Sequence, residues 1–206
     1  MSSNDLKAYH VGEDSEGGHV VVFATSGAAA RRAGGNELDL EFSAVEFCRR
    51  AQWADQYAGQ PFIPAKAFHD AGWWLRCSYC ETTNYDDAED DDGNPLTMVY
   101  DGPDVYCSQS CKDAKEKDID DANERGDAFI RKVHEARPDL HFVRFRCGWP
   151  YVTMTAEFTF PGCRYGGEIV DQKGDGNLAM YVAGYDGDDF QAYERSRNRA
   201  VTEQRA

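Results

Sequence analysis

The chain has 206 residues, of which 41% are hydrophobic and 13% aromatic, so it can bury a sizeable core and is not a disordered protein. It has no run of about 18 apolar residues and no basic start followed by an apolar segment, so we expect neither a transmembrane helix nor a secretory signal. A cytoplasmic location is the resulting expectation.

The formal net charge of −15 is concentrated in one segment. Residues 85–104 hold eight acids and no base, and removing these from the 37 acids leaves 29 against 22 basic residues, or −7. Binding to a phosphate backbone needs clustered Lys and Arg, so this composition disfavours it. A basic protein surface is the better electrostatic match, although an acidic segment can also serve only to keep a chain soluble.

The N-terminal part is expected to form a small α+β layer. Residues 6–11 and 19–24 read as strands, and the turn-prone GEDSEGG lies between them. Ser26 is placed to cap a short alanine-rich helix, which the glycines at 34–35 would end. Residues 38–48 alternate apolar and polar side chains, which predicts a half-buried strand, and residues 50–76 read as an irregular connection.

A long helix is predicted from Ser108 to the Arg137-Pro138 pair. Its apolar residues recur at steps of three and four and would share one face: Ile119, Ala122, Gly126, Phe129, Val133 and Ala136. After it, residues 141–147, 151–160, 166–172 and 177–185 read as an antiparallel meander, and residues 189–200 as a terminal helix.

These elements predict an α+β fold with antiparallel sheets and a long helix. We expect three segments: residues 1–72, an N-terminal α+β part; residues 73–137, a cysteine-containing part with the acidic loop and the long helix; and residues 138–206, the C-terminal meander with a short terminal helix. The first and third could pack together as one domain.

Seven cysteines is an odd number, and in a cytoplasmic protein close pairs favour a metal over disulfides. Cys77 and Cys80 are separated by two residues, as in a tight turn that aims both sulfurs at one ion. Cys107 and Cys111 are separated by three residues at the expected helix start, where one turn brings both side chains to the same side. Four thiolates suit tetrahedral zinc, one per chain, and a site filled by protein ligands is structural.

The alternatives for these thiols are unligated buried cysteines or a redox pair. His69, eight residues before Cys77, could replace one ligand. Cys48, Cys147 and Cys163 fit strand or turn positions as small hydrophobic residues.

Residues 74–114 resemble a treble-clef zinc finger of the TRASH-like type. The resemblance implies that the segment 73–137 is a zinc finger with an acidic loop, inserted in the α+β fold ahead of the long helix. The resemblance rests on CSYC and on VYCSQSCKD, in which Tyr106, Cys107, Ser108, Cys111 and Lys112 fit the aromatic-Cys-Ser-x-x-Cys-Lys segment that opens the helix in that group. The acidic stretch DDAEDDDGNP would form a loop at the tip of the finger's hairpin.

The whole chain is also similar to uncharacterised proteins of bacteriophages and prophages. The shared elements are ELDLEFSAVEFCRRAQWADQYA, a Pro-containing linker, GWW, the cysteine finger and a late FPGCRYGG. This resemblance implies a phage accessory protein in the cytoplasm of a bacterial host and assigns no activity.

No catalytic motif stands out. None of the five histidines lies in a spacing typical of a general base or an open metal site: His10, His19, His69, His134 and His141. Nucleases built on a treble clef need a histidine base, and residues 81–110 contain none. Residues 88–99 resemble a calcium loop but carry Ala88 and Val99 where acidic ligands are required, so a solvated loop is the better interpretation.

The leading hypothesis is therefore a non-enzymatic, zinc-binding accessory protein of a phage or mobile element. It would bind a basic protein partner, such as a host nucleic-acid-binding or defence complex that it inhibits. The candidate binding residues are Asp86, Asp87, Glu89, Asp90, Asp91 and Asp92.

The alternative is a nucleic-acid-binding regulatory protein. It would use small basic clusters: Arg49 and Arg50, Arg144 and Arg146, and Arg195, Arg197 and Arg199. An enzyme whose site is assembled from scattered residues is the third hypothesis.

Overall fold

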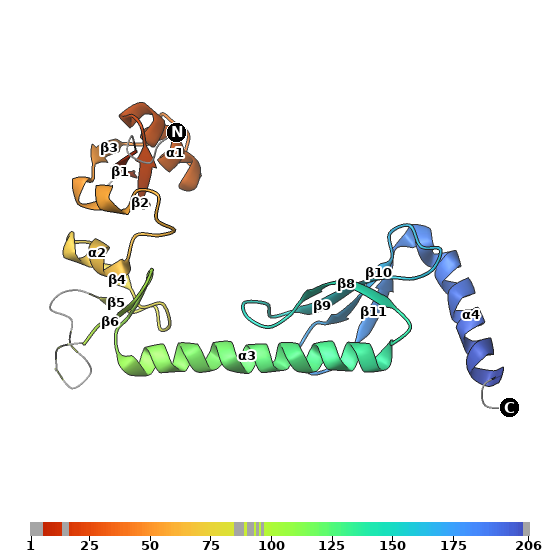
Figure 1. The fold of residues 1–206 in the computed structure, drawn as a ribbon. Helices are drawn as coiled ribbons and strands as arrows, with labels where there is room; N and C mark the ends of the chain where they lie inside the picture. The colour runs from red at the N-terminus through yellow and green to blue at the C-terminus, as the bar shows by residue number, and fades with distance from the viewer. Residues whose placement is uncertain are drawn as a thin grey trace. The chain divides into compact units, whose positions relative to one another are not determined.

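The computed structural model describes residues 6–13, 17–84, 89, 93, 95 and 97–203. It divides into two compact units, Met1–Lys112 and Asp113–Ala206, each with its own hydrophobic core (Figure 1). Antiparallel sheets and a long helix confirm the α+β fold class. The division into three segments stays a prediction. In the described part of the chain, no helix is both long and apolar enough to cross a membrane.

The first unit is built on a three-stranded antiparallel sheet in the order β2 (His19–Ala24), β1 (Lys7–Gly12) and β3 (Phe47–Arg50). Helix α1 (Gly27–Glu37) covers one face, and the Ser26 side chain caps it by accepting the backbone N–H of Ala29 at 3.2 Å. A Cβ atom at Gly34 would lie 2.6 Å from Val11, so glycine allows the helix to approach the central strand.

The other face of this sheet packs against the connection that follows β3. This connection forms a 3-10 helix, η2 (Gln52–Tyr57), and a short helix, α2 (Ala65–Asp70), so it is more regular than expected. Its buried Ala54 and Ile63 contact Ala8 on β1. Asp55 fixes the junction because its Oδ1 accepts the backbone N–H of Ala8 at 2.7 Å.

The strand predicted over residues 38–48 is wrong for most of its length. Residues 38–46 form turns, and only the end of the segment enters β3. The alternating apolar side chains still reach the core, where Val45 is fully buried and Leu40 is half-buried. The Arg31 side chain stabilises the turns by donating to the carbonyls of Phe42 and Val45, a long-range contact that local alternation cannot reveal.

Two small hairpins complete the first unit. One joins β4 (Leu75–Arg76) to β5 (Thr83–Asn84), and the other joins β6 (Val99–Asp101) to β7 (Asp104–Tyr106). The turn of the second hairpin is tied to α2, because Ala65 donates its N–H to the carbonyl of Gly102 at 2.9 Å. Helix α3 (Gln109–Ala136) follows this hairpin directly.

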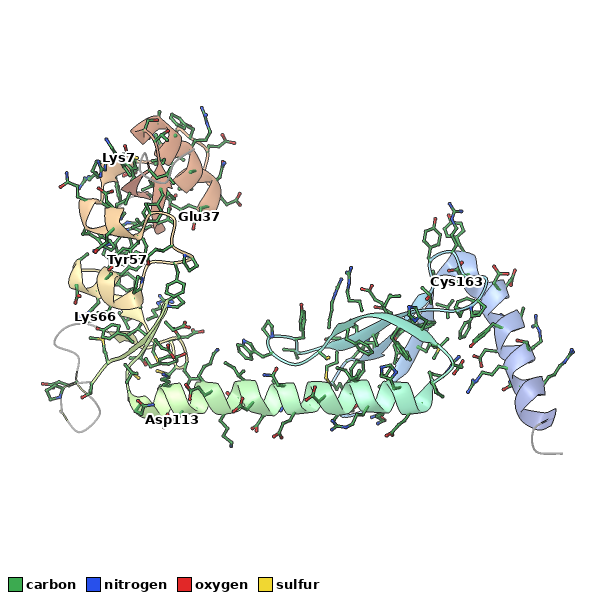
Figure 2. The ribbon with its side chains drawn as sticks, viewed as in Figure 1. Lys7, Glu37, Tyr57, Lys66, Asp113 and Cys163 are labelled. Carbon is green, nitrogen blue, oxygen red and sulfur yellow. The ribbon has the colours of Figure 1, made fainter. Side chains whose placement is uncertain are left out.

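The second unit is a four-stranded antiparallel meander, as predicted, with its strands side by side in chain order: β8 (His141–Arg146), β9 (Met154–Thr159), β10 (Gly167–Asp171) and β11 (Ala179–Val182). The 3-10 helix η3 (Gly184–Asp186) leads into helix α4 (Gly187–Glu203). Side chains of α3 and the sheet fill the space between them (Figure 2).

The predicted apolar face of α3 is largely confirmed. Ala122, Gly126, Phe129 and Val133 are buried, and Phe129 and Val133 pack in the core with residues of the sheet. Ile119 is half-buried, whereas Ala136 is exposed because the helix ends there and the chain turns toward β8.

Two contacts fix the loops of the second unit. Gly126 of α3 lies directly against the loop after β8, since a Cβ atom there would stand 2.6 Å from the backbone nitrogen of Gly148. The buried carboxylate of Asp186 accepts backbone N–H groups from Arg164, Tyr165 and Gly166, at 2.9, 2.6 and 2.6 Å. Through these bonds η3 holds the turn before β10.

Candidate metal centre

Four cysteines from two separate segments meet at one point in the first unit. The sulfur atoms of Cys77, Cys80, Cys107 and Cys111 all lie within 4.8 Å of one another. Cys77 is buried, Cys107 and Cys111 are half-buried, and Cys80 is exposed. The structure therefore brings together the two pairs that the sequence spacing singled out, and all seven cysteines are free of disulfides.

The first pair lies in the turn of the β4–β5 hairpin. Cys77 donates its N–H to the carbonyl of Thr82 at 2.9 Å, and Glu81 donates to the carbonyl of Cys77 at 3.0 Å. Glu81 adopts a left-handed conformation, with φ of 62°, which reverses the chain after Cys80. This tight turn directs both sulfurs to the same side.

The second pair stands at the junction of β7 and α3. The Ser108 hydroxyl accepts the backbone N–H of Cys111 at 3.3 Å and thus caps the first turn of the helix. One helical turn separates the two cysteines, and their sulfurs are 3.4 Å apart. The two segments are also joined by the backbone, because Ser78 donates its N–H to the carbonyl of Val105 at 2.8 Å.

The distances between sulfurs fit a tetrahedral metal. Four sulfurs bound about 2.3 Å from one zinc ion stand about 3.8 Å apart, and Cys80 and Cys107 are separated by 3.6 Å. A disulfide needs about 2.05 Å, so these thiols are not cross-linked. Thiolate ligands of this number and arrangement select soft or borderline ions, and zinc is the common choice.

The pKa values of Cys80 and Cys107 also favour a bound cation. The Thr82 hydroxyl, 3.3 Å from Cys80 Sγ, together with the Thr82 backbone N–H, lowers the pKa of Cys80 to about 6. Burial, with the neighbouring thiols, raises the pKa of Cys107 to about 12. The Cys80 thiolate therefore forms readily, and its negative charge opposes the ionisation of the other three thiols. A divalent cation bound among the sulfurs would lower the pKa of Cys107 and allow all four thiols to ionise.

Sequence reasoning missed two contacts that support this cluster. The first is the Thr82 hydroxyl beside Cys80. The second is an ion pair of 2.8 Å between Lys112, next to the last cysteine, and Asp101 of β6. The Lys112 position is visible in the CKD motif, but its partner depends on how the β6–β7 hairpin packs on the helix.

His69 does not join the four sulfurs. Its Nδ1 lies 2.8 Å from the hydroxyl of Tyr100, so α2 is linked to β6 instead. Cys48 and Cys163 have hydrogen bonds elsewhere, with the carbonyl of Gly27 and the N–H of Phe160, and Cys147 packs at the edge of the second core. The substitute-ligand hypothesis for His69 therefore has no geometric support.

The predicted partner-binding residues fall mostly outside the described residues. Glu89 is described and exposed. The others lie outside: Asp86, Asp87, Asp90, Asp91 and Asp92. The calcium-loop comparison over residues 88–99 depends on the same positions.

Several arginines proposed to contact nucleic acid form ion pairs within the chain. Arg144 and Arg146 lie 3.8 and 3.4 Å from the carboxylate of Glu157. Arg50 pairs with Asp55, and Arg197 lies near Asp139 and Glu194. These pairs reduce the positive charge that each cluster presents.

Comparison with known proteins adds no assignment: no family model, curated protein or solved structure matches this chain.

Proposed function

We propose that the protein is a non-enzymatic zinc-binding interaction protein in which one structural zinc ion is held by Cys77, Cys80, Cys107 and Cys111. The convergence of four sulfurs within 4.8 Å carries this proposal. When bound, zinc would supply a cross-link between the β4–β5 turn and the start of α3. Four protein ligands leave no position for a reactive water, which supports a structural role over a catalytic one.

The arrangement of the hairpins and the CSQSCK segment supports assignment to the TRASH-like treble-clef group. In the order of its elements the metal site has a hairpin turn with two ligands, a second hairpin, and a helix whose first turn supplies the other two. Lys112, the last residue of the motif, is held by Asp101 of the second hairpin. The lysine at this position thus links the start of α3 to the second hairpin through an ion pair.

The acidic segment is the proposed contact surface. It lies between the two ligand pairs in sequence, so zinc would fix both ends of the chain that carries it. Its six acidic residues at 86–92 would attract a basic protein surface and exclude nucleic acid. A phage or mobile-element accessory protein of this kind would act in the host cytoplasm. Its target would be a nucleic-acid-binding or defence complex of the host, which it would inhibit.

Direct nucleic-acid binding is the second candidate. Arg50, Arg144 and Arg146 form ion pairs with carboxylates, which leaves less positive charge for a nucleic acid than the sequence suggested. Counterion release requires cations that are free to neutralise phosphates, and a chain with net charge −15 offers few.

The test is a pull-down from bacterial lysate at moderate salt with the intact protein as bait. We expect a basic protein in stoichiometric amount, lost when Asp86, Asp87, Glu89, Asp90, Asp91 and Asp92 are changed to Asn or Gln. A matched control neutralises six acids on α3 and removes the same charge: Asp118, Asp120, Asp121, Glu124, Asp127 and Glu135. Retention by the control and loss by the first variant support the proposal.

Failure to recover any stoichiometric basic partner contradicts the proposed contact. Salt-sensitive gel shifts with single- or double-stranded DNA or RNA would instead support the second candidate. The zinc proposal is tested separately, by elemental analysis, and expects about one zinc per chain.

A further inference from the structure

The first unit holds a cavity of about 630 Å³ that is separate from the metal centre and lies beside the turn end of the β1–β2 hairpin, where Gly12 pairs with His19. Two strands and the segment after α2 form its walls. Its lining consists of His10, Gly17, Gly18, His19, Ala71, Gly72, Trp73 and Trp74. The volume lies within the range of pockets that hold small molecules.

Histidine and tryptophan side chains form much of the wall of this cavity. His10 and His19 project from the same face of neighbouring strands, and their ring centroids are 5.0 Å apart. The ring of His10 also lies 4.5 Å from that of Trp73 and 4.8 Å from that of Phe47. The cluster is therefore ordered by mutual packing of its rings in the absence of a ligand.

His10 carries an unmet hydrogen-bonding group. Its Nε2 is buried and has no hydrogen-bond partner in the part of the chain that the structure describes. Leaving such an atom unpaired is unfavourable, so a ligand gains free energy by bonding to it once the His10 ring turns far enough to expose Nε2 to the cavity. Burial, and then the charges of His19 and Arg49, lower the pKa of His10, so this imidazole is neutral at pH 7.

A turn at Gly72 forms one side of the cavity. Gly72 has a φ of 81°, which ends α2 with a sharp turn, and a Cβ atom there would meet no atom within 4 Å. Trp74 on the cavity wall is 57% exposed, so a large apolar surface is left for a ligand to cover. Apart from the two imidazoles, the lining residues carry no ionisable side chain.

We propose that this cavity binds an uncharged, planar heteroaromatic compound. Its ring would lie against the indoles of Trp73 and Trp74, and its polar edge would exchange a hydrogen bond with His10 Nε2. Arg49, whose guanidinium lies 5.1 Å from the centre of the Phe47 ring, opposes a cationic ligand at this end of the sheet. A neutral imidazole and indole faces favour a neutral ring over a charged group.

This inference does not depend on the proposed zinc or partner function. The cavity and the metal centre adjoin in sequence, because Trp74 is followed by β4 and then Cys77, but they share no residue. Variants of the cavity can therefore be tested in protein that retains its metal content.

The test titrates the full chain with adenosine, cytidine and indole, and follows tryptophan fluorescence and the imidazole ¹⁵N signals of His10. We expect saturable binding by at least one of these probes with a shift of His10 Nε2. Trp74→Ala should weaken it about tenfold, since it removes an aromatic face on which the ligand ring stacks. His10→Phe retains a ring in the cluster but removes Nε2, and should weaken binding about fivefold.

Trp149→Ala, on the second unit, is the matched control and should leave binding unchanged, because Trp149 is an exposed tryptophan that does not line the cavity. Thermal unfolding and metal content verify that each variant is folded. No saturable change with any of the three probes overturns the proposal, as does binding that survives Trp74→Ala and His10→Phe. Binding of a deoxyadenosine oligonucleotide without binding of adenosine also overturns the proposal. In that case the ligand would be a single-stranded nucleic acid and not a free heteroaromatic compound.

Discussion

Cys80 Sγ lies 3.6 Å from Cys107 Sγ, although 26 residues separate the two cysteines in the sequence. A loop of this length is costly to close, and the small β4–β5 and β6–β7 hairpins bury little apolar surface to offset that cost. A metal ion held by both cysteine pairs would cross-link them and so stabilise the first unit.

The first prediction concerns this cross-link. Cys107→Ser should abolish stoichiometric zinc binding and destabilise the first unit, because structural zinc contributes folding free energy directly. Elemental analysis and thermal unfolding with and without a chelator measure both effects. Cys48→Ala, outside the cluster, should retain one zinc; a Cys107→Ser protein that keeps its zinc and its chelator sensitivity would contradict the assignment.

The second prediction concerns the approach of α3 to the loop after β8. Gly→Ala inside a helix is ordinarily stabilising by about 1 kcal/mol. At Gly126 the new Cβ would stand 2.6 Å from Gly148 N and 2.9 Å from its Cα, and backbone atoms cannot move aside cheaply. Gly126→Ala should therefore lower the free energy of unfolding by about 1–3 kcal/mol, measured by urea denaturation.

Gly184→Ala is the control for that change. A Cβ atom at Gly184 meets no atom within 4 Å, so the substitution should be close to neutral. If Gly126→Ala and Gly184→Ala were equally stable, α3 and the loop after β8 could move apart without loss of stability, which would contradict the prediction.

The third prediction concerns the Asp186 carboxylate. Burial by itself would raise the pKa of Asp186, but the N–H groups of Arg164, Tyr165 and Gly166 bond the charged form and lower it overall. Asp186→Ala should release these three amides and speed their hydrogen exchange, with a loss of stability. Asp188→Ala, at an exposed position two residues later, should leave their exchange unchanged.

The fourth prediction is a pH dependence in the second unit. The Arg137 guanidinium, which donates to both carboxylate oxygens of Asp139, lowers the pKa of that carboxyl from 3.8 to about 2. A carboxyl with a lowered pKa contributes stability that is fully present above its unfolded value and is lost as pH falls toward the folded value. Stability should drop by about 1–2 kcal/mol between pH 4 and pH 2 through this group.

Asp139→Asn measures that contribution. The variant should be less stable than the parent at pH 6, and the difference should shrink as pH falls below 4, in urea denaturation followed at each pH. A difference that stays constant down to pH 2 would assign the loss to packing and not to charge.

The sequence by itself determined the features that arise from short spacings. The helical repeat of Ala122, Phe129 and Val133 predicted α3, and turn residues at regular intervals predicted the C-terminal meander. The two cysteine pairs predicted the cluster of four sulfurs, because each pair lies within one turn of chain and its geometry is local.

Only the tertiary structure decided which distant groups meet. Residues 38–46 alternate like a strand but form turns, since Arg31 provides bonds to their carbonyls from α1. Asp186 holds a turn about 20 residues earlier in the sequence. The rings of His10 and Trp73 meet across 62 intervening residues, which leaves a buried imidazole nitrogen beside a cavity. Such contacts depend on how whole elements pack, and no local pattern of residue types encodes them.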